Sequence, residues 1–262
     1  MLKEKLCKQY QKKSDKEHVL DNPDTYIGSI EKVDTNQNIF NEENKKIEEK
    51  EILLIPGLYK LFDEGIVNCR DHWVRMKKDT SNYQVTEIKV DIKDNIISFT
   101  NDGNGIDIEQ HPEYKIWIPE LIFGHLRTST NYNKDEKKIV GGKNGFGFKL
   151  VLIWSEWGTI ETVDHIRGLK YIQEFKNNLD IIEKPKITKY KGKPYTKVSF
   201  KPDFKRLKIE GLSQDMIALF QRRVMDIAAV TDKTVKVKYN NIQIAIKTFE
   251  QYLNLYIGTK SD

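Results

Sequence analysis

Two polar residues one helical turn apart have the chemistry needed to act on a phosphate. Glu64 and Asn68 are four residues apart, so on a helix they share one face. A carboxylate there can act as a general base toward water, and an amide oxygen one turn further on can bind Mg²⁺, which prefers oxygen ligands. Taken alone, the pair is also compatible with a solvated polar face that continues through Asp71 and Arg75.

A second polar group follows directly after a strand-like run. The residues Asn101-Asp102-Gly103-Asn104-Gly105 allow a tight turn, because glycine adopts backbone angles that other residues avoid. Asn101 can donate and accept hydrogen bonds together, which suits the edge of an adenine base. The same residue types also form ordinary turns, so this segment alone leaves both interpretations open.

Four glycines crowd residues 140–150, which read VGGKNGFGFKL. Bare backbone N–H groups, a helix N-terminus and a nearby ammonium can together cradle a phosphate. The spacing Gly-x-x-Gly-x-Gly is neither a Walker loop nor the dinucleotide-binding fingerprint, and a flexible turn is the alternative interpretation. The polar loop before it carries short side chains suited to ribose or phosphate oxygens.

The elements that must position these groups can be placed by their patterns. Apolar residues recur at three- and four-residue spacing over 56–73, which predicts a helix, and Pro56 suits its first turn. Further helices are expected at 118–126 and 215–230. The expected strands are 86–92 and 95–100, paired around Lys93-Asp94, then 159–164, 170–175, 179–183 and 196–200, and a hairpin turning at Asn240-Asn241.

This order of helices and strands predicts an α+β fold, a two-layer sandwich with a mixed, largely antiparallel sheet and helices on one face. Ser14 and Glu17 form a capping-box pattern for a short helix that ends before Pro23. The charge run at 41–51 is expected to be a solvated hairpin or loop.

The composition sets the broad class of protein. The 262 residues carry a formal net charge of +5, which permits contact with nucleic acid without requiring it. Cys7 and Cys69 form neither a metal-ligand cluster nor a disulfide framework. The sequence shows no membrane-spanning apolar run and no signal-peptide core, so we expect an intracellular protein that does not bind a membrane.

In their order along the chain, the three polar groups resemble the ATP site of the GHKL ATPases. Five longer stretches, 10–31, 55–68, 118–132, 135–150 and 195–203, resemble the N-terminal ATPase region of eukaryotic-type type IIA DNA topoisomerases, over nearly the whole chain. The resemblance implies a GHKL-type sandwich at 22–245. It also implies an N-terminal arm or strap at 1–21 and, at 246–262, the start of the link to a transducer domain.

Carried over position by position, the resemblance implies a role for each site residue. Glu64 would polarise the attacking water, Asn68 would hold Mg²⁺, and Asn101 would contact adenine with Thr196 nearby. The remaining ATP contacts would come from Ser129, Thr130, Asn131, Gly142, Lys143, Asn144, Gly145, Phe146, Gly147, Phe148 and Lys149.

Four positions depart from the pattern of this family. Lys143, Phe146 and Phe148 stand where arginine, tyrosine and alanine are common. Lysine lacks the planar fork of arginine, and the bulk of Phe148 would lie beside the phosphates. His72 replaces an asparagine, which puts a secondary nucleotide contact in doubt.

The resemblance implies a function in a larger machine. The domain would bind and hydrolyse ATP with Mg²⁺ and dimerise when ATP binds. It would thereby close a gate on double-stranded DNA in an enzyme that passes one duplex through a transient double-strand break to relax or decatenate DNA. Because the lysine that reaches the γ-phosphate would lie in the transducer, we expect this chain alone to be a weak ATPase.

Two alternatives stay open at the level of the sequence. One is another GHKL ATPase, of the chaperone or mismatch-repair type. The other is a nucleotide-gated dimerisation module that does not hydrolyse ATP, which would follow if Phe148 closed the site. The place of action would be the nucleus or a site of viral DNA replication.

Overall fold

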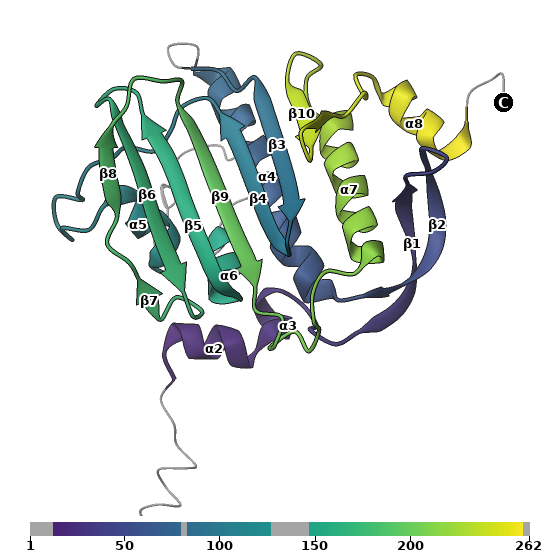
Figure 1. The fold of residues 1–262 in the computed structure, drawn as a ribbon, viewed down its shortest axis with the longest axis horizontal. Coiled ribbons are helices and arrows are strands. Elements are labelled where there is room, and N and C mark those ends of the chain that lie inside the picture. The colour runs from purple at the N-terminus through teal and green to yellow at the C-terminus, as the bar shows by residue number, and fades with distance from the viewer. Residues whose placement is uncertain (1–12, 80–82, 127–146, 259–262) are drawn as a thin grey trace, which may run out of the picture.

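The computed structural model describes residues 13–79, 83–126 and 147–258. Their main sheet has nine strands in the spatial order β11-β10-β3-β4-β9-β5-β6-β7, and β8 also pairs with β6. Figure 1 views this sheet face-on. Its strands are β3 (Glu87–Lys93), β4 (Ile96–Asp102), β5 (Ser155–Asp164), β6 (Leu169–Lys176), β7 (Ile181–Ile182), β8 (Lys186–Lys189), β9 (Tyr195–Pro202), β10 (Lys236–Tyr239) and β11 (Ile242–Gln243).

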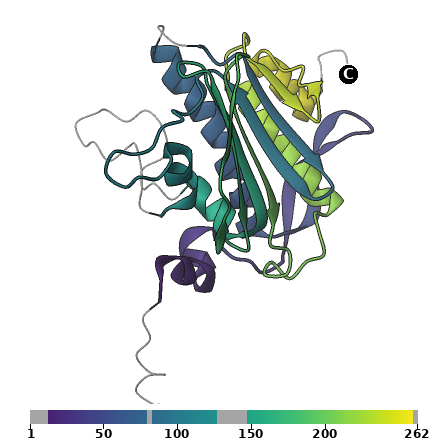
Figure 2. The same ribbon diagram turned by 60° about the vertical axis from the view of Figure 1, so that its left-hand side comes forward.

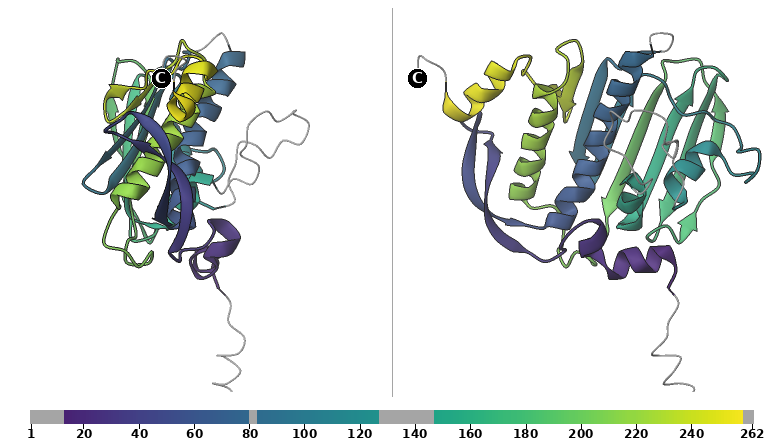
Figure 3. Two further views of the ribbon diagram at one scale, coloured as in Figure 1. Left: turned by 90° about the vertical axis from the view of Figure 1, so that its right-hand side faces the viewer. Right: turned by 180° about the vertical axis from the view of Figure 1, so that it is seen from behind.

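Helices cover one face of this sheet, as the views from the side and from behind show (Figures 2 and 3). The long helix α4 lies against β3 and β4, α6 lies against β5 and β9, and α7 lies beside α4. The helices are α2 (Asp15–Asp21), α3 (Pro23–Tyr26), α4 (Pro56–Lys78), α5 (Ile118–Gly124), α6 (Gly147–Ile153), α7 (Gln214–Ala229) and α8 (Phe249–Ile257). No helix in these residues is long and apolar enough to cross a membrane.

The strand pairing is largely antiparallel. The central pairs β3–β4, β4–β9, β9–β5 and β5–β6 all run antiparallel, while β10 runs parallel to β3. The α+β sandwich expected from the sequence, with a mixed sheet and helices on one face, is therefore confirmed. The short edge strand β8 was missed, because its four residues KITK carry too little alternation to register as a strand.

Two tight turns explain how the hairpins close. Asp94 and Asn95 have φ values of 52° and 62°, and Asn240 and Asn241 have 47° and 65°. Two successive residues with positive φ make the turn that best matches the twist of paired strands, and Asn and Asp tolerate it. The expected turn at Lys93-Asp94 is therefore shifted by one residue, since Lys93 ends β3.

The charged segment 41–51 belongs to a longer hairpin of β1 (Val33–Asn41) and β2 (Lys46–Leu54). Its turn is exposed, as expected, but one side of the ribbon is apolar. Ile39 and Ile52 are buried against Leu219 of α7. The hairpin thus forms a second, two-stranded sheet that packs on α7. The sequence did not predict this packing, because the charged residues of the segment indicated a solvated hairpin or loop.

The short helix α2 begins as the sequence predicts. The Ser14 side chain accepts from the backbone N–H of Glu17, and the Glu17 carboxylate accepts from the backbone N–H of Ser14 at 2.7 Å. The two bonds satisfy N–H groups that a helix start leaves unpaired. Val19 is fully buried, so α2 is held at both its cap and its apolar face.

Helix α4 positions the first polar group of the site. The apolar residues expected on one face are buried in the structure, with Trp73 half-buried. They include Leu58, Leu61, Phe62 and Ile66, none of which is exposed to solvent. The helix continues to Lys78, beyond the expected end at 73.

Gly65 sets how closely α4 approaches the sheet. A Cβ atom built on Gly65 would lie 2.1 Å from the Phe99 ring on β4, far inside van der Waals contact. The missing side chain lets the α4 backbone rest directly on Phe99, whose ring packs 5.3 Å from that of Phe62. Because Glu64 is the preceding residue, this contact also fixes the height of Glu64 above the sheet.

We expect Gly65→Ala to destabilise the protein, although alanine is the better helix former by about 1 kcal/mol. Overpacking against Phe99 should dominate, with a net loss of about 1–3 kcal/mol in the free energy of unfolding. Urea titration followed by circular dichroism measures this loss. Lys78→Ala, at an exposed position of the same helix, is the control, and a stabilised Gly65→Ala would contradict the assigned packing.

Candidate functional site

The structure brings the Glu64–Asn68 pair next to the end of the glycine-rich segment. Gly147 begins α6, and a Cβ built on it would lie 3.1 Å from Glu64 Oε2 and 4.0 Å from Asn68 Nδ2. The end of the glycine-rich segment therefore meets the Glu-x₃-Asn face of α4. The glycine allows this approach because any side chain there would press on the carboxylate.

Asn101 lies at the end of β4, on the side of the sheet that the helices cover. Its side chain is 7% exposed, and its Nδ2 donates to the carbonyl oxygen of Asp102 at 2.9 Å. That bond does not use the carboxamide oxygen, the atom that could accept from an amine on a purine. Thr196 stands opposite Asn101 in the β4–β9 register, so the two residues expected near adenine are neighbours.

Thr196 is in turn held by the next strand. Its hydroxyl lies 3.0 Å from the Thr162 hydroxyl on β5. The same Thr162 oxygen accepts from the backbone N–H of Ile106 at 3.0 Å. Gly105 has to be glycine here, since a Cβ would lie 1.8 Å from the carbonyl oxygen of Val163. The far end of the Asn101–Gly105 turn is thus fixed on β5.

Asp102 anchors the near end of this turn, a role that the sequence pattern did not reveal. Its buried carboxylate accepts from the backbone N–H groups of Thr86 at 2.7 Å and Glu87 at 2.8 Å. The Thr86 hydroxyl and the Lys193 ammonium also donate to it. Burial raises the pKa of Asp102, but the hydrogen bonds from Lys193 and Thr86 outweigh it, so the pKa lies below its usual value.

His72 continues the stripe of Glu64 and Asn68 along α4, and its ring faces the turn. A Cβ on Gly103 would lie 3.2 Å from His72 Nε2, and the imidazole hydrogen-bonds to the backbone of Asn104. Burial, helped by the charge of Arg75, lowers the pKa of His72 to about 4. The neutral ring therefore holds the turn against α4, at the position where the resemblance leads us to expect an asparagine.

The structure places the Phe148 side chain in the apolar core. The ring is 8% exposed and packs edge-on against Phe123 and Phe200, at centroid distances of 5.8 and 6.1 Å. Its bulk fills the apolar core between α5, α6 and the sheet. The packing of the ring leaves the backbone of Phe148 as its candidate contact to a nucleotide, and that contact stays a prediction.

Lys149 follows within the same helix and is 3% exposed. Burial lowers the pKa of its ammonium to about 8, because removing a cation from water disfavours the charged form. An anionic group brought next to Lys149 would reverse part of that effect. The remaining predicted contacts lie outside the described residues and stay predictions: Ser129, Thr130, Asn131, Gly142, Lys143, Asn144, Gly145 and Phe146.

The donor set suits a metal ion that keeps most of its own water. The described residues hold no group of three or more His, Cys, Asp or Glu side chains that could bind a metal. Mg²⁺ commonly takes one or two protein oxygens together with substrate phosphates. The Asn68 amide, next to Glu64 and the start of α6, fits that mode of binding.

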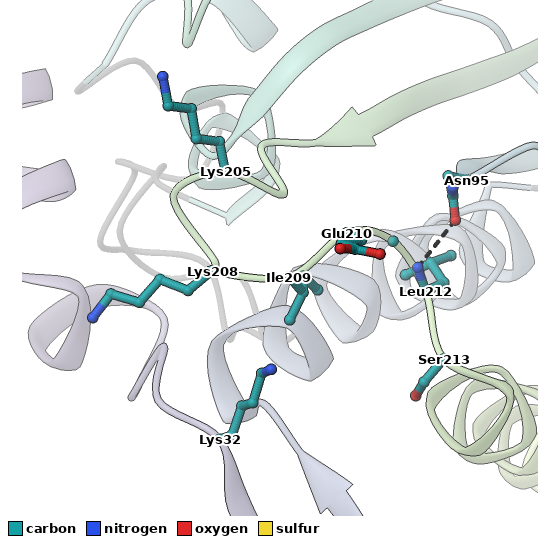
Figure 4. A pocket seen from close by; sticks show the side chains of 9 residues that line it. Lys32, Asn95, Lys205, Lys208, Ile209, Glu210, Leu212 and Ser213 are labelled. Carbon is teal, nitrogen blue, oxygen red and sulfur yellow. Dashed lines mark hydrogen bonds between the residues drawn. The ribbon is translucent and has the colours of Figure 1, made fainter.

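A separate hollow opens at the other end of the β3–β4 hairpin. It has a volume of about 840 Å³ and is lined by the loop before α7 together with Lys32 and Asn95. Figure 4 shows Asn95 accepting a hydrogen bond from the backbone N–H of Leu212, at 3.0 Å, with Lys205 and Lys208 directed outward. No residue of the candidate site lines this hollow.

The fold and this arrangement of polar groups define the class of protein. Residues 54–205 match the family of histidine kinase-, DNA gyrase B- and HSP90-like ATPases, and the chain belongs to that family. The ATPase domain of Thermus thermophilus gyrase B shares the fold at 20% identity, with a TM-score of 0.57 over 87% of this chain and 50% of that chain.

The relatives with higher sequence identity are topoisomerase II proteins. DNA topoisomerase 2 of Acanthamoeba polyphaga mimivirus is 48% identical over 94% of this chain, and that of Saccharomyces cerevisiae is 45% identical over 95%. The solved ATPase region of S. cerevisiae topoisomerase II matches with a TM-score of 0.90 and 44% identity, covering 95% of this chain and 65% of that chain. The chain spans 19% and 17% of the two full-length relatives.

We expect Asp102→Asn to destabilise the protein by about 1–3 kcal/mol near neutral pH, because the amide cannot satisfy the same buried donors. The folded-state pKa of Asp102 lies below the unfolded value of about 4. The carboxylate's contribution is therefore complete above pH 4 and is lost as the pH falls through the folded-state pKa. Urea unfolding of both proteins at pH 7, 5 and 3 measures the difference, which should shrink only at the lowest pH.

Proposed function

We propose that this chain is the ATP-binding gate domain of an ATP-dependent type IIA DNA topoisomerase. The observation that carries the proposal is the meeting of Gly147 with Glu64 and Asn68. It would join a backbone proposed to bind phosphate to a candidate base and a candidate metal ligand. The near-full-length similarity to topoisomerase 2 proteins supports this function over a chaperone or mismatch-repair ATPase.

The proposed chemistry assigns a task to each side of the site. Glu64 accepts a hydrogen bond from the attacking water and orients it toward the γ-phosphate of ATP. Asn101 accepts from the adenine amine, with Thr196 beside it. Mg²⁺, held through Asn68, would supply positive charge to the phosphates. Gly147 leaves its backbone bare so that the triphosphate can lie close to α4.

In the whole protein, ATP binding would join two copies of this domain and close a gate around double-stranded DNA. Hydrolysis would reopen the gate, and strand cleavage would be the task of other domains. The proposed place of action is a nucleus or a site of viral DNA replication. The domain boundaries at 21/22 and 245/246 are part of the proposal, and α8 begins at Phe249, just beyond the second.

The alternative of a gate that cannot hydrolyse ATP depended on Phe148 closing the site. The ring of Phe148 packs in the core with Phe123 and Phe200, which removes the specific reason for that alternative. Slow hydrolysis by this chain alone stays part of the proposal, since the lysine proposed to reach the γ-phosphate would come from a transducer domain.

Titration with a non-hydrolysable ATP analogue and Mg²⁺, by calorimetry, tests the proposal. We expect one site per chain. Asn68→Ala should weaken binding at least tenfold with Mg²⁺ present and much less with EDTA, since it removes a metal ligand. Asn101→Ala should weaken binding under both conditions, because its contact is to the base.

The matched control is Asn36→Ala, an exposed asparagine of the β1–β2 hairpin. Sedimentation velocity of the same samples reports dimerisation. Absence of analogue binding by the wild-type chain would overturn the proposed function, and binding without a shift to dimer would remove the gating step.

Lys149 supplies a test that depends on protonation. If its ammonium lies beside a phosphate, binding raises the pKa from about 8. The complex should then take up about half a proton at pH 8 and little at pH 6.5. Calorimetry in two buffers of different ionisation enthalpy measures this uptake. Lys149→Met should abolish it, and an unchanged proton uptake in that variant would exclude the contact.

A further inference from the structure

The carboxylate of Glu64 forms an ion pair with Lys60, a residue to which the proposed function assigns no other role. Lys60 Nζ lies 2.6 Å from Glu64 Oε1, and the side chains are 43% and 21% exposed. The other oxygen, Oε2, faces Gly147 at the start of α6. The two carboxylate oxygens thus have separate surroundings, one tied to an ammonium and one directed at the candidate phosphate site.

Helix electrostatics do not account for this pair. Lys60 precedes Glu64 by four residues, which is the less favourable order for an ion pair on a helix. Exposed pairs of this kind contribute little to stability. The neighbouring acid, Asp63, is engaged elsewhere, since Arg223 of α7 donates to it at 2.7 Å. Among the described residues, Lys60 is therefore the cation placed to orient Glu64.

We propose that Lys60 is a positioning residue, which holds Glu64 Oε1 so that Oε2 points at the water to be activated. The inference rests on the proposed function, because it takes Glu64 as the base. A free glutamate samples several rotamers, and fixing one of them costs conformational entropy. The ion pair fixes the carboxylate before ATP arrives, so it should act on the reaction and leave nucleotide binding unchanged.

The first measurement is single-turnover hydrolysis of γ-labelled ATP by the 262-residue chain, with protein in excess over ATP. Lys60→Met should lower the rate about tenfold, since small misplacement of a reacting group has a large effect. Affinity for the non-hydrolysable analogue should stay within about twofold of wild type. Lys60→Arg should restore most of the rate, because a guanidinium can hold the same oxygen.

The second measurement does not require turnover. It is the affinity of the chain for ADP with aluminium fluoride, a complex that mimics the transferring phosphoryl group and its in-line water. Lys60→Met should weaken this complex about tenfold while the ATP-analogue affinity is kept. In a Glu64→Gln background Lys60→Met should add nothing to either loss, because the two residues act as one unit. Lys78→Met, on the exposed end of α4, is the control.

The outcomes separate the inference from the proposed function. A wild-type chain that binds no ATP analogue would overturn the proposed function. If the wild type binds the analogue, equal effects of Lys60→Met on the analogue and on the aluminium fluoride complex would show that Lys60 binds nucleotide directly. No effect on either complex, or additive losses with Glu64→Gln, would likewise overturn the positioning role.

Discussion

The close approach of α4 to the sheet is the contact on which the candidate site depends. Gly65 rests on the ring of Phe99, and the apolar residues on either side of Gly65 are fully buried. A packed interior does not deform continuously. The contact between Gly65 and Phe99 therefore fixes the distance of α4 from the sheet and its rotation about its own axis. Glu64, Asn68 and His72 then project along one edge of α4, toward the start of α6 and the turn after β4.

The turn that carries Asn101 is secured from both sides, which a glycine-rich segment could not achieve alone. Asp102 ties its near end to Thr86 and Glu87, and Gly105 packs against β5. His72 joins the turn to α4. The turn after β4 and the α4 face that carries Glu64 and Asn68 are therefore held in place relative to each other, and under the proposed function this would reduce the entropy lost when a nucleotide binds.

The departures of this chain from related sequences also have physical explanations where the structure describes them. Phe148 contributes a ring to the core, so its size is compatible with an open phosphate site. His72 is half-buried, its lowered pKa keeps it neutral near pH 7, and its ring hydrogen-bonds to the backbone of Asn104 in the turn. Substitutions beside a ligand site therefore need not change the ligand, because a side chain can turn toward the core while its backbone stays in place.

The sequence by itself determined the layers of the fold and the residue types of the site. Apolar spacing located α4 and α7, Asn and Asp pairs marked two hairpin turns, and the resemblance of the ordered polar groups to the GHKL site implied an ATPase. These signals are local, and periodicity and turn chemistry report them directly. Only the tertiary structure decided that Gly147 meets Glu64, that Asp102 anchors the turn and that Phe148 faces the core. Each of these depends on contacts between segments distant in sequence, whose geometry no local pattern specifies.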